Sequence, residues 1–262
     1  MYRKYLFYSL FFILHAFSLI PGESNYSKKA IIIGSSSGIG EAVAKELSKR
    51  GYIIGITGRR KNLLEDLQKN IGSNVFIKVM DISKPELAQK DLINLIGELE
   101  GLDLIVVSSG TGNLDLDWQK QKEIIDVNVL GFTAMVNVAT QYFLNQNKGH
   151  IVGISSIAAL RGFADAPIYS ASKAFVSSYL QGLREKFKRL NKNIHVTDIQ
   201  PGFVDTQMGK SSDFWKASPE KAATQICDTI EQKRNHAYVT KRWRLIAWLI
   251  KLLPDYLFYK IF

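Results

Sequence analysis

The sequence is poor in the residues that mark disulfide-stapled, cysteine-metal or repeat proteins. It has one cysteine, Cys227, in 262 residues, so it can form no internal disulfide and no cysteine-based metal cluster, and we expect no bound metal. Neither an internal repeat nor a low-complexity segment is visible. We interpret Cys227 as a small apolar side chain on a helix. The single cysteine fits a protein of a reducing compartment.

Acidic residues are scarce at both ends of the chain, and this scarcity produces the net charge of +10. Residues 1–29 hold four basic residues against Glu23, and residues 233–262 hold seven against Asp255. The segment between them is nearly neutral. Because the basic excess does not lie on the body of the protein, we expect no nucleic-acid partner.

The chain has the size of one domain. Its 262 residues are 46% hydrophobic and 22% charged, enough for one α/β domain with a full core and too few for two ordinary domains. We place this domain at residues 28–240.

Residues 1–27 form an apolar N-terminal segment. After Arg3 and Lys4 the run from Tyr5 to Ile20 is almost wholly apolar, shorter than a typical bilayer span and about as long as a signal-peptide core. Three interpretations stay open: a membrane anchor, a cleaved signal, or a translation start set too far upstream. The third requires a non-Met start codon, since no methionine lies between Met1 and Met80.

From Ala30 onward short apolar runs alternate with amphipathic stretches, which is typical of β-α-β units. The predicted strands are Ala30–Ile33, Tyr52–Thr57, Val75–Met80, Leu102–Val107, His150–Ile154, Ile194–Ile199 and Ala237–Thr240. The predicted helices are Ile39–Arg50, Asn62–Ile71, Pro85–Glu100, Glu123–Asn145, Ala171–Leu190 and Pro219–Gln232. Ser83 and Ser218 are expected to cap two of them. The pattern predicts an α/β doubly wound Rossmann fold with a mostly parallel seven-stranded sheet.

A glycine-rich turn joins the first strand to the first helix. Its residues of interest are Gly34, Ser36, Ser37, Gly38, Ile39 and Gly40. Glycines let the backbone approach a pyrophosphate, and the helix start favours its negative charge. Where an NAD-specific Rossmann protein has an acid after the second strand, this chain has Arg59 and Arg60, which suit the 2′-phosphate of NADP(H).

The candidate proton donor is Tyr169, four residues before Lys173. On a helix this spacing puts phenol and ammonium on one face, and a nearby positive charge lowers a tyrosine pKa. A second Tyr-x-x-x-Lys pair, Tyr256 and Lys260, occurs near the C-terminus, so context decides. Only Tyr169 has Ser156 thirteen residues upstream, at the end of a predicted strand.

These motifs together resemble the short-chain dehydrogenase/reductase family over roughly residues 28–240. The resemblance implies that Ser156, rather than its neighbour Ser155, polarises the substrate oxygen, and that Asn128 supports a proton relay through Lys173. Many members have Asn-Asn-Ala-Gly where this chain has Val107-Ser108-Ser109-Gly110. The cofactor contacts implied by the resemblance are Asp81 and Ile82 at the adenine, Gly110, and Pro201, Gly202, Val204 and Thr206 at the nicotinamide, with Tyr169 and Lys173.

The resulting hypothesis is an NADPH-dependent oxidoreductase that reduces a carbonyl, or oxidises an alcohol, on a small apolar substrate. The apolar preference rests on Leu160, Phe163, Phe203, Met208, Phe214 and Trp215. The alternatives are a non-catalytic NADPH-binding protein and a membrane-surface interaction protein. We expect the protein to be cytoplasmic, because NADPH is not expected outside the cytoplasm. We also expect a homo-oligomer, a dimer or tetramer.

Residues 241–262 are predicted to form a basic amphipathic C-terminal helix. Leu245, Trp248, Leu249 and Leu252 share one face, cations cluster at the start, and Pro254 ends the pattern. This is expected of a helix in a membrane interface. The alternative is that the face packs on the protein's own domain or on a second subunit.

Overall fold

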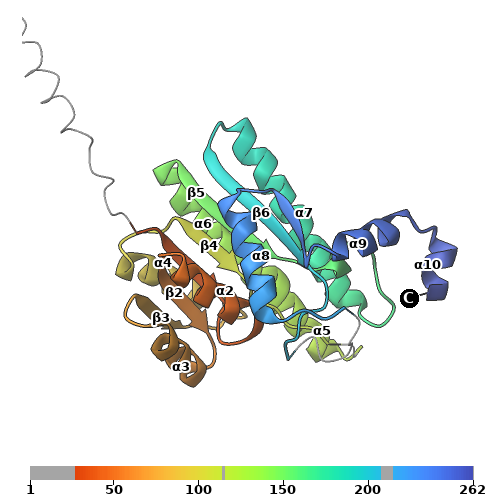
Figure 1. The fold of residues 1–262 in the computed structure, drawn as a ribbon, viewed down its shortest axis with the longest axis horizontal. Helices are drawn as coiled ribbons and strands as arrows, with labels where there is room; N and C mark the ends of the chain where they lie inside the picture. Colours follow the sequence, from red (N-terminus) through yellow and green to blue (C-terminus); the bar gives the residue numbers. More distant parts are fainter. Residues whose placement is uncertain (1–26, 114–115, 208–214, 262) are drawn as a thin grey trace, which may run out of the picture.

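The computed structural model describes residues 27–113, 116–207 and 215–261, and its centre is one seven-stranded sheet. The strands are β1 (Lys29–Ile33), β2 (Ile53–Gly58), β3 (Val75–Val79), β4 (Leu104–Val107), β5 (Lys148–Ile154), β6 (Asn193–Pro201) and β7 (His236–Val239). Their spatial order is β3-β2-β1-β4-β5-β6-β7, and every neighbouring pair is parallel (Figure 1). The predicted doubly wound Rossmann fold is confirmed, and the sheet is wholly parallel.

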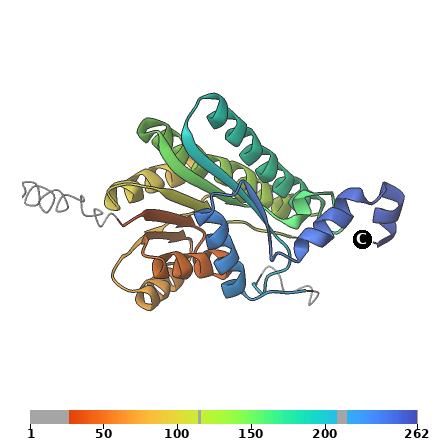
Figure 2. The ribbon, with the colours of Figure 1, turned by 45° about the horizontal axis from the view of Figure 1, so that its top comes forward.

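Helices cover both faces of this sheet (Figures 1 and 2). They are α2 (Gly38–Lys49), α3 (Lys61–Ile71), α4 (Pro85–Glu98), α5 (Trp118–Ile125), the π-helix η1 (Asp126–Gly131), α6 (Phe132–Gln146), the 3₁₀ turn η2 (Ile157–Ala159), α7 (Pro167–Arg189), α8 (Pro219–Glu231), α9 (Trp243–Leu252) and α10 (Asp255–Ile261).

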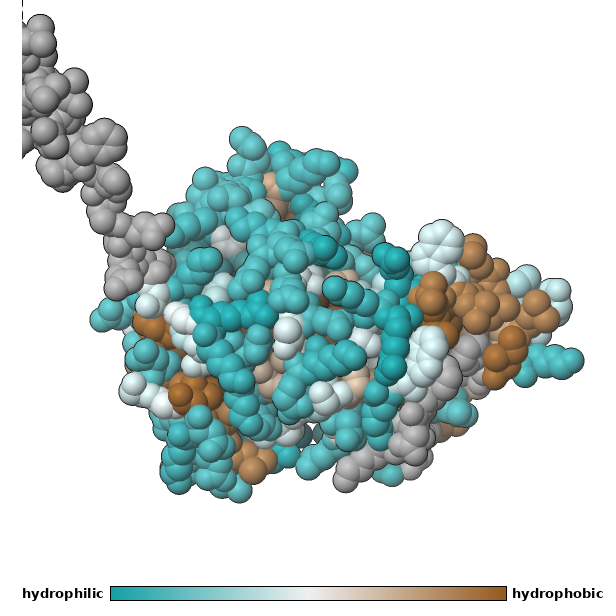
Figure 3. All heavy atoms as spheres, viewed as in Figure 1, coloured by the Kyte–Doolittle hydropathy of each residue, from teal (hydrophilic) through white to brown (hydrophobic). Residues whose placement is uncertain are grey.

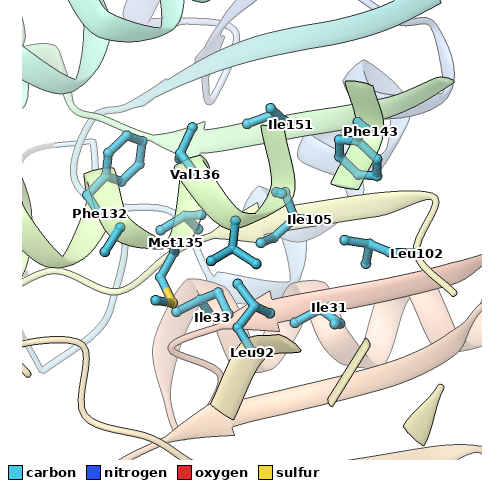
Figure 4. Close-up of a cluster of buried hydrophobic side chains, with 14 of the residues drawn as sticks. Ile31, Ile33, Leu92, Leu102, Ile105, Phe132, Met135, Val136, Phe143 and Ile151 are labelled. Carbon is cyan, nitrogen blue, oxygen red and sulfur yellow. The ribbon is translucent and has the colours of Figure 1, made fainter. Parts of the chain in front are cut away.

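Alternation along the strands divides the core in two. Ile31 and Ile33 of β1 face a cluster shared with α4, α6 and α7, whereas Ala30 and Ile32 face a cluster shared with α2, α3 and α8. Figure 4 shows the first cluster, in which Phe132 and Met135 of α6 meet the sheet. The strands are apolar on both faces because both faces are covered, as expected of a parallel sheet.

Several predicted boundaries are wrong. The predicted helix Glu123–Asn145 begins earlier, at Trp118, because the Asp117 side chain caps it by accepting from the backbone N–H groups of Gln119 and Lys120. The predicted helix that started at Ala171 begins at Pro167, so Tyr169 lies inside it. Ser218 caps α8 as predicted.

Ser83 is not a helix cap. Lys84 occupies the cap position of α4, and the Ser83 hydroxyl instead donates to Asp81 Oδ1 at 2.8 Å. The Ser83 hydroxyl, which the sequence pattern predicted as the cap of this helix, therefore hydrogen-bonds to the Asp81 carboxylate in the preceding turn.

One helical stretch of the described chain, Trp118–Gln146, is long and apolar enough by composition to cross a membrane. Sixty-one per cent of its most apolar window is buried inside the protein. It comprises α5, η1 and α6, and α6 contributes Phe132 and Phe143 to the core. Its apolar character therefore serves the packing of the sheet.

The C-terminal region forms two helices, α9 and α10, in place of the single predicted one, with Pro254 between them. They project from the main body as an arm (Figure 1). The chain enters α9 directly after β7, whose carboxyl end lies at the same sheet edge as the ends of the other parallel strands. The predicted N-terminal segment, apart from Ser27, lies outside the described residues.

Candidate active site

The glycine-rich turn is built for close approach at the end of β1. A Cβ at Gly34 (φ +86°) would lie 2.4 Å from Ser109 Oγ, and one at Gly40 would lie 2.1 Å from the Gly34 carbonyl oxygen. Gly38 has φ +64°, in the left-handed region. Glycine is therefore required at each position, and the turn leaves its outer side open for a phosphate at the start of α2.

The three serines of this turn have different roles. Ser35 is fully buried, donates to the Ile32 and Thr57 carbonyls, and accepts from the Thr57 N–H. Ser36 and Ser37 instead accept from the Arg60 guanidinium at 2.8 and 2.6 Å. Ser35 thus joins β1 to β2, while the other two hydroxyls lie with Arg60 at the rim of the turn.

The two arginines after β2 are separated in space. Arg60 lies on the glycine-rich turn, whereas Arg59 is exposed and its guanidinium is 3.9 Å from the Glu123 carboxylate. Of the two, Arg60 is the one whose guanidinium lies against Ser36 and Ser37.

The turn after β3 touches the π-helix. A Cβ at Gly131 would lie 2.4 Å from the Ile82 carbonyl oxygen. The Asp81 carboxylate accepts from both the N–H and the hydroxyl of Ser83, at 3.1 and 2.8 Å. Asp81 and Ile82 therefore lie at the sheet edge after β3, with Ile82 against the π-helix.

Ser156, Tyr169 and Lys173 lie together at the ends of β5 and α7. The Ser156 side chain lies close enough to the Tyr169 hydroxyl to lower its pKa. The Lys173 ammonium is 5.7 Å from the centre of the Tyr169 ring and donates to the Ile154 carbonyl at 3.0 Å. One polar face thus carries a phenol, a hydroxyl and a buried ammonium.

The protonation of these groups follows from their burial. Burial raises the pKa of Tyr169, and the nearby Ser156 hydroxyl offsets only part of this rise. The expected lowering of the Tyr169 pKa by Lys173 is wrong for this arrangement, in which the ammonium bonds the Ile154 carbonyl. Burial lowers the pKa of Lys173 to about 8, against the opposing effect of Asp198. At neutral pH the phenol is protonated and the ammonium largely charged.

Asn128 is buried within the π-helix, and both polar atoms of its side chain form hydrogen bonds. Its Oδ1 accepts from the Thr111 N–H at 2.9 Å, and its Nδ2 donates to the Thr111 carbonyl at 2.8 Å and to Ser172 Oγ at 3.0 Å. A Cβ at Gly110 would meet Lys173 Nζ at 3.2 Å and Asn128 Oδ1 at 3.5 Å. Asn128 and Gly110 therefore place the segment after β4 against Lys173.

The structure separates Ser155 from Ser156. Ser155 is buried and its hydroxyl donates to the carboxylate of Asp198 and to the Ile199 carbonyl. Ser156, at the start of η2, accepts from the Ala158 N–H at 3.1 Å and faces Tyr169. Ser155 is engaged behind the site and Ser156 lies within it.

Asp198 is the residue that the sequence reasoning missed. It is buried in β6, and besides Ser155 it accepts from Ser177 Oγ at 2.6 Å and Gln200 Nε2 at 3.0 Å. Its charge acts on Lys173. The available signal was an acid inside the otherwise apolar strand Ile194–Ile199, because a buried acid needs such partners.

The segment after β6 forms the opposite side of the site. Val204 is buried and pairs with Ala217 in an isolated bridge, and Thr206 lies 3.0 Å from the position of a Cβ at Gly38. A Cβ at Gly202 would lie 2.0 Å from the Trp243 indole. Pro201 and Gly202 thus lie between the sheet and α9. Met208 and Phe214, predicted to face the substrate, lie outside the described residues.

The fold and this edge define a nucleotide-binding Rossmann oxidoreductase. A family model described as short chain dehydrogenase matches residues 28–217. The chain therefore belongs to the short-chain dehydrogenase/reductase family, as the motifs predicted.

Known proteins of this kind resemble the chain over most of its length. An uncharacterized oxidoreductase of Myxococcus xanthus is 32% identical over 250 residues, covering 90% of this chain and 96% of the relative. A Brucella melitensis 3-ketoacyl-(acyl-carrier-protein) reductase, solved with NADH, has a TM-score of 0.76 at 22% identity and covers 83% of this chain and 98% of its own. ElxO, solved with NADP, has a TM-score of 0.74 at 22% identity, with coverages of 82% and 97%.

Proposed function

We propose that this protein is an NADPH-dependent reductase of a carbonyl group on a small apolar substrate, able also to oxidise the corresponding alcohol. The observation that carries the proposal is the grouping of Ser156, Tyr169 and the Lys173 ammonium, which lies 5.7 Å from the centre of the phenol ring, with the glycine-rich turn at the same sheet edge.

The residues at this edge fit a nicotinamide dinucleotide. Gly34, Gly38 and Gly40 leave a cradle that side chains would fill, and the start of α2 favours a pyrophosphate. When bound, the cofactor supplies the hydride. The segment Pro201, Gly202, Val204 and Thr206 would hold the nicotinamide end, and Asp81 with Ile82 the adenine end.

The protein's own groups handle the proton. The Tyr169 phenol, kept protonated by burial, donates its proton to the substrate oxygen as the hydride reaches the carbonyl carbon. The Ser156 hydroxyl polarises that oxygen, and the Lys173 ammonium stabilises the phenolate that remains. Hydride and proton together convert the carbonyl to the alcohol.

Asn128 acts in this proposal by positioning. Its bonds to both backbone groups of Thr111 fix the segment after β4, and its bond to Ser172 fixes α7 one residue before Lys173. These bonds set the place of the ammonium relative to the phenol.

The preference for NADPH is supported by Arg60, whose guanidinium lies against Ser36 and Ser37. No acid follows β2 until Glu65 in α3. A 2′-phosphate would therefore meet donors and no opposing carboxylate. Arg59 contributes through its charge at the rim.

The apolar character of the substrate is supported by Leu160 and Phe163 in the loop after Ser156, and by Phe203 and Trp215 in the segment after β6. The proposal also takes the protein to be cytoplasmic. A homo-oligomer, a dimer or tetramer, is supported by the exposed apolar side chains of Leu130 on η1 and Phe175 on α7. A non-catalytic NADPH-binding protein is disfavoured, because a binder has no use for a buried ammonium beside a protonated phenol.

The test is NADPH oxidation by the purified full chain against ketones, aldehydes, 3-oxoacyl thioesters and steroids. Tyr169→Phe should lower turnover at least about 10²-fold, since general acid catalysis contributes 10²–10⁴-fold, while NADPH binding followed by fluorescence titration stays near wild type. Retention of more than about a tenth of the activity would show that Tyr169 is not the proton donor.

A further inference from the structure

The helix α9 has two apolar faces. Trp243, Ala247 and Ile250 form an inner face, buried against the domain. The outer face, formed by Leu245, Trp248, Leu249 and Leu252, is exposed. The Leu245 side chain is 68% accessible and that of Leu252 is 70% accessible. Among the described residues, this outer face does not pack on the chain's own domain.

The inner face ties α9 to one wall of the active site. The Trp243 indole occupies the space beside Gly202 that a Cβ would need, and its ring stacks edge-on against Phe203 at 5.4 Å. The orientation of α9 is therefore set by the segment that flanks the catalytic edge.

The helix α10 is tied to the other wall, the loop after Ser156. Arg161 donates to the Leu253 carbonyl at 2.7 Å, pairs with Asp255, and lies 4.8 Å over the Phe258 ring. Phe163 packs edge-on against the same ring at 5.4 Å. The arm of α9 and α10 thus joins the segment after β6 to the loop after Ser156.

The outer face continues onto α10 as an apolar patch with a basic margin. Tyr256 and Ile261 extend the exposed apolar surface, and Figure 3 shows it as a contiguous hydrophobic area over α9 and α10. The exposed cations around it are Lys241, Arg242, Arg244, Lys251 and Lys260. The one acid of this described arm, Asp255, is paired with Arg161.

From this surface we infer that the arm docks on an anionic lipid bilayer and that the substrate is a carbonyl or alcohol that partitions into the lipid. The inference on substrate class rests on the proposed function. On α9, Arg244 and Lys251 lie on the flank between the inner and outer faces. An anionic surface neutralises these cations, whereas a second copy seated face to face would bring like charges together. Because the arm contacts the segments after Ser156 and after β6, docking brings this edge of the sheet to the lipid surface.

Docking is tested on the full chain by tryptophan quenching, which reports on α9 itself. Vesicles of phosphatidylglycerol and phosphatidylcholine carrying nitroxide-labelled acyl chains should quench Trp248, and Trp248→Phe should remove most of that quenching. Trp118→Phe is the matched control, because Trp118 is 62% and Trp248 64% exposed. Equal quenching of both variants would overturn the inference.

The contributions of apolar contact and charge are tested by vesicle flotation. Arg244→Gln with Lys251→Gln should weaken binding about 25-fold at low salt, about fivefold for each cation. Leu245→Gln with Leu252→Gln should weaken it about tenfold or more, and Leu87→Gln with Ile93→Gln, exposed on α4, should leave it unchanged. If the leucine pair changed the oligomeric mass and left flotation intact, the face would be a subunit interface and the inference would be wrong.

The substrate class is tested with two carbonyl compounds of equal reactivity, one water-soluble and one dissolved in the vesicles. The leucine pair should lower NADPH oxidation with the lipid-dissolved compound about tenfold or more, in step with binding, and leave the soluble compound unaffected. Equal rates with both compounds would overturn delivery from lipid. Absence of turnover with either compound, alongside Trp248 quenching, would instead contradict the proposed function and leave docking established.

Discussion

At the scale of single residues, the two arginines after β2 have different surroundings although they are neighbours in the chain. Arg60 reaches Ser36 and Ser37 on the glycine-rich turn, and Arg59 points to Glu123. A 2′-phosphate distinguishes NADPH from NADH, so the residue that binds it should affect one cofactor and spare the other.

We predict that Arg60→Ala raises the dissociation constant for NADPH at least about tenfold, as expected for loss of a charge-assisted contact of 1.5–3 kcal/mol, and changes that for NADH little. Arg59→Ala is the control and should have the smaller effect. Isothermal titration with both cofactors measures this. Equal losses for NADPH and NADH in the Arg60 variant would mean that Arg60 is only surface charge.

The ionisation of Lys173 sets a second prediction. Its pKa of about 8 lies below the usual value because it is buried. The charged form therefore prevails below pH 8 and is lost above it. Since the ammonium stabilises the phenolate, kcat/KM for carbonyl reduction should be level near pH 7 and fall as the pH rises through about 8.

Asp198 raises the pKa of Lys173, so Asp198→Asn should move this fall to lower pH. Ser177→Ala removes one hydrogen bond of Asp198 and keeps its charge, so it should leave the fall in place. A pH profile of kcat/KM compares the three proteins. If the fall in kcat/KM occurred at the same pH in the Asp198 variant as in the wild type, the ionisation of Lys173 would not be its cause.

At the scale of elements, the π-helix η1, which lies between α5 and α6, contacts the turn after β3. Gly131 has no room for a side chain, because its Cβ would lie 2.4 Å from the Ile82 carbonyl. Gly182 in α7 also lies within a helix, and nothing approaches its Cβ position within 4 Å. The two glycines therefore form a matched pair.

We predict that Gly131→Ala destabilises the fold by about 1–3 kcal/mol through overpacking and weakens NADPH binding by displacing Ile82. Gly182→Ala should stabilise by about 0.4–1 kcal/mol, because alanine restricts the unfolded chain and fits the helix. Urea unfolding and cofactor titration measure both effects. Destabilisation by the same amount in the two variants would show that the contact with Ile82 does not matter.

At the scale of the whole molecule, buried histidine makes the fold sensitive to acid. His150 of β5 is buried, shares a hydrogen bond of 2.8 Å with Thr197, and lies 5.8 Å from His195. Burial lowers the pKa of His150 to about 3, and also lowers that of His195. The unfolded chain takes up these protons near pH 6.5 and the folded chain only at lower pH.

Stability is therefore complete above about pH 6.5 and falls as the pH drops toward 3. We predict that His150 alone lowers the free energy of unfolding by about 2 kcal/mol between pH 7.5 and pH 5, measured by urea unfolding. His150→Gln should show a smaller loss over the same interval. An identical loss in the variant would assign the acid sensitivity to other groups.

The sequence by itself determined the fold class and the family of the chain. Alternating apolar runs indicated a parallel sheet, and the spacing of Gly34, Gly38 and Gly40 after a strand indicated the dinucleotide turn. The interval between Tyr169 and Lys173 placed both on one helical face. Each of these signals lies within one strand, one turn or one helix, where backbone geometry alone relates the residues.

Only the tertiary structure decided what depends on contacts between distant segments. Ser155 faces Asp198 of β6 while Ser156 faces Tyr169, and Arg60 rather than Arg59 meets the glycine-rich turn. The chain leaves the outer face of α9 bare because Trp243, on the other face, fills the space beside Gly202. Sheet order and side-chain packing set these pairings, and no periodicity along the sequence encodes which of two adjacent residues will meet a partner far away in the chain.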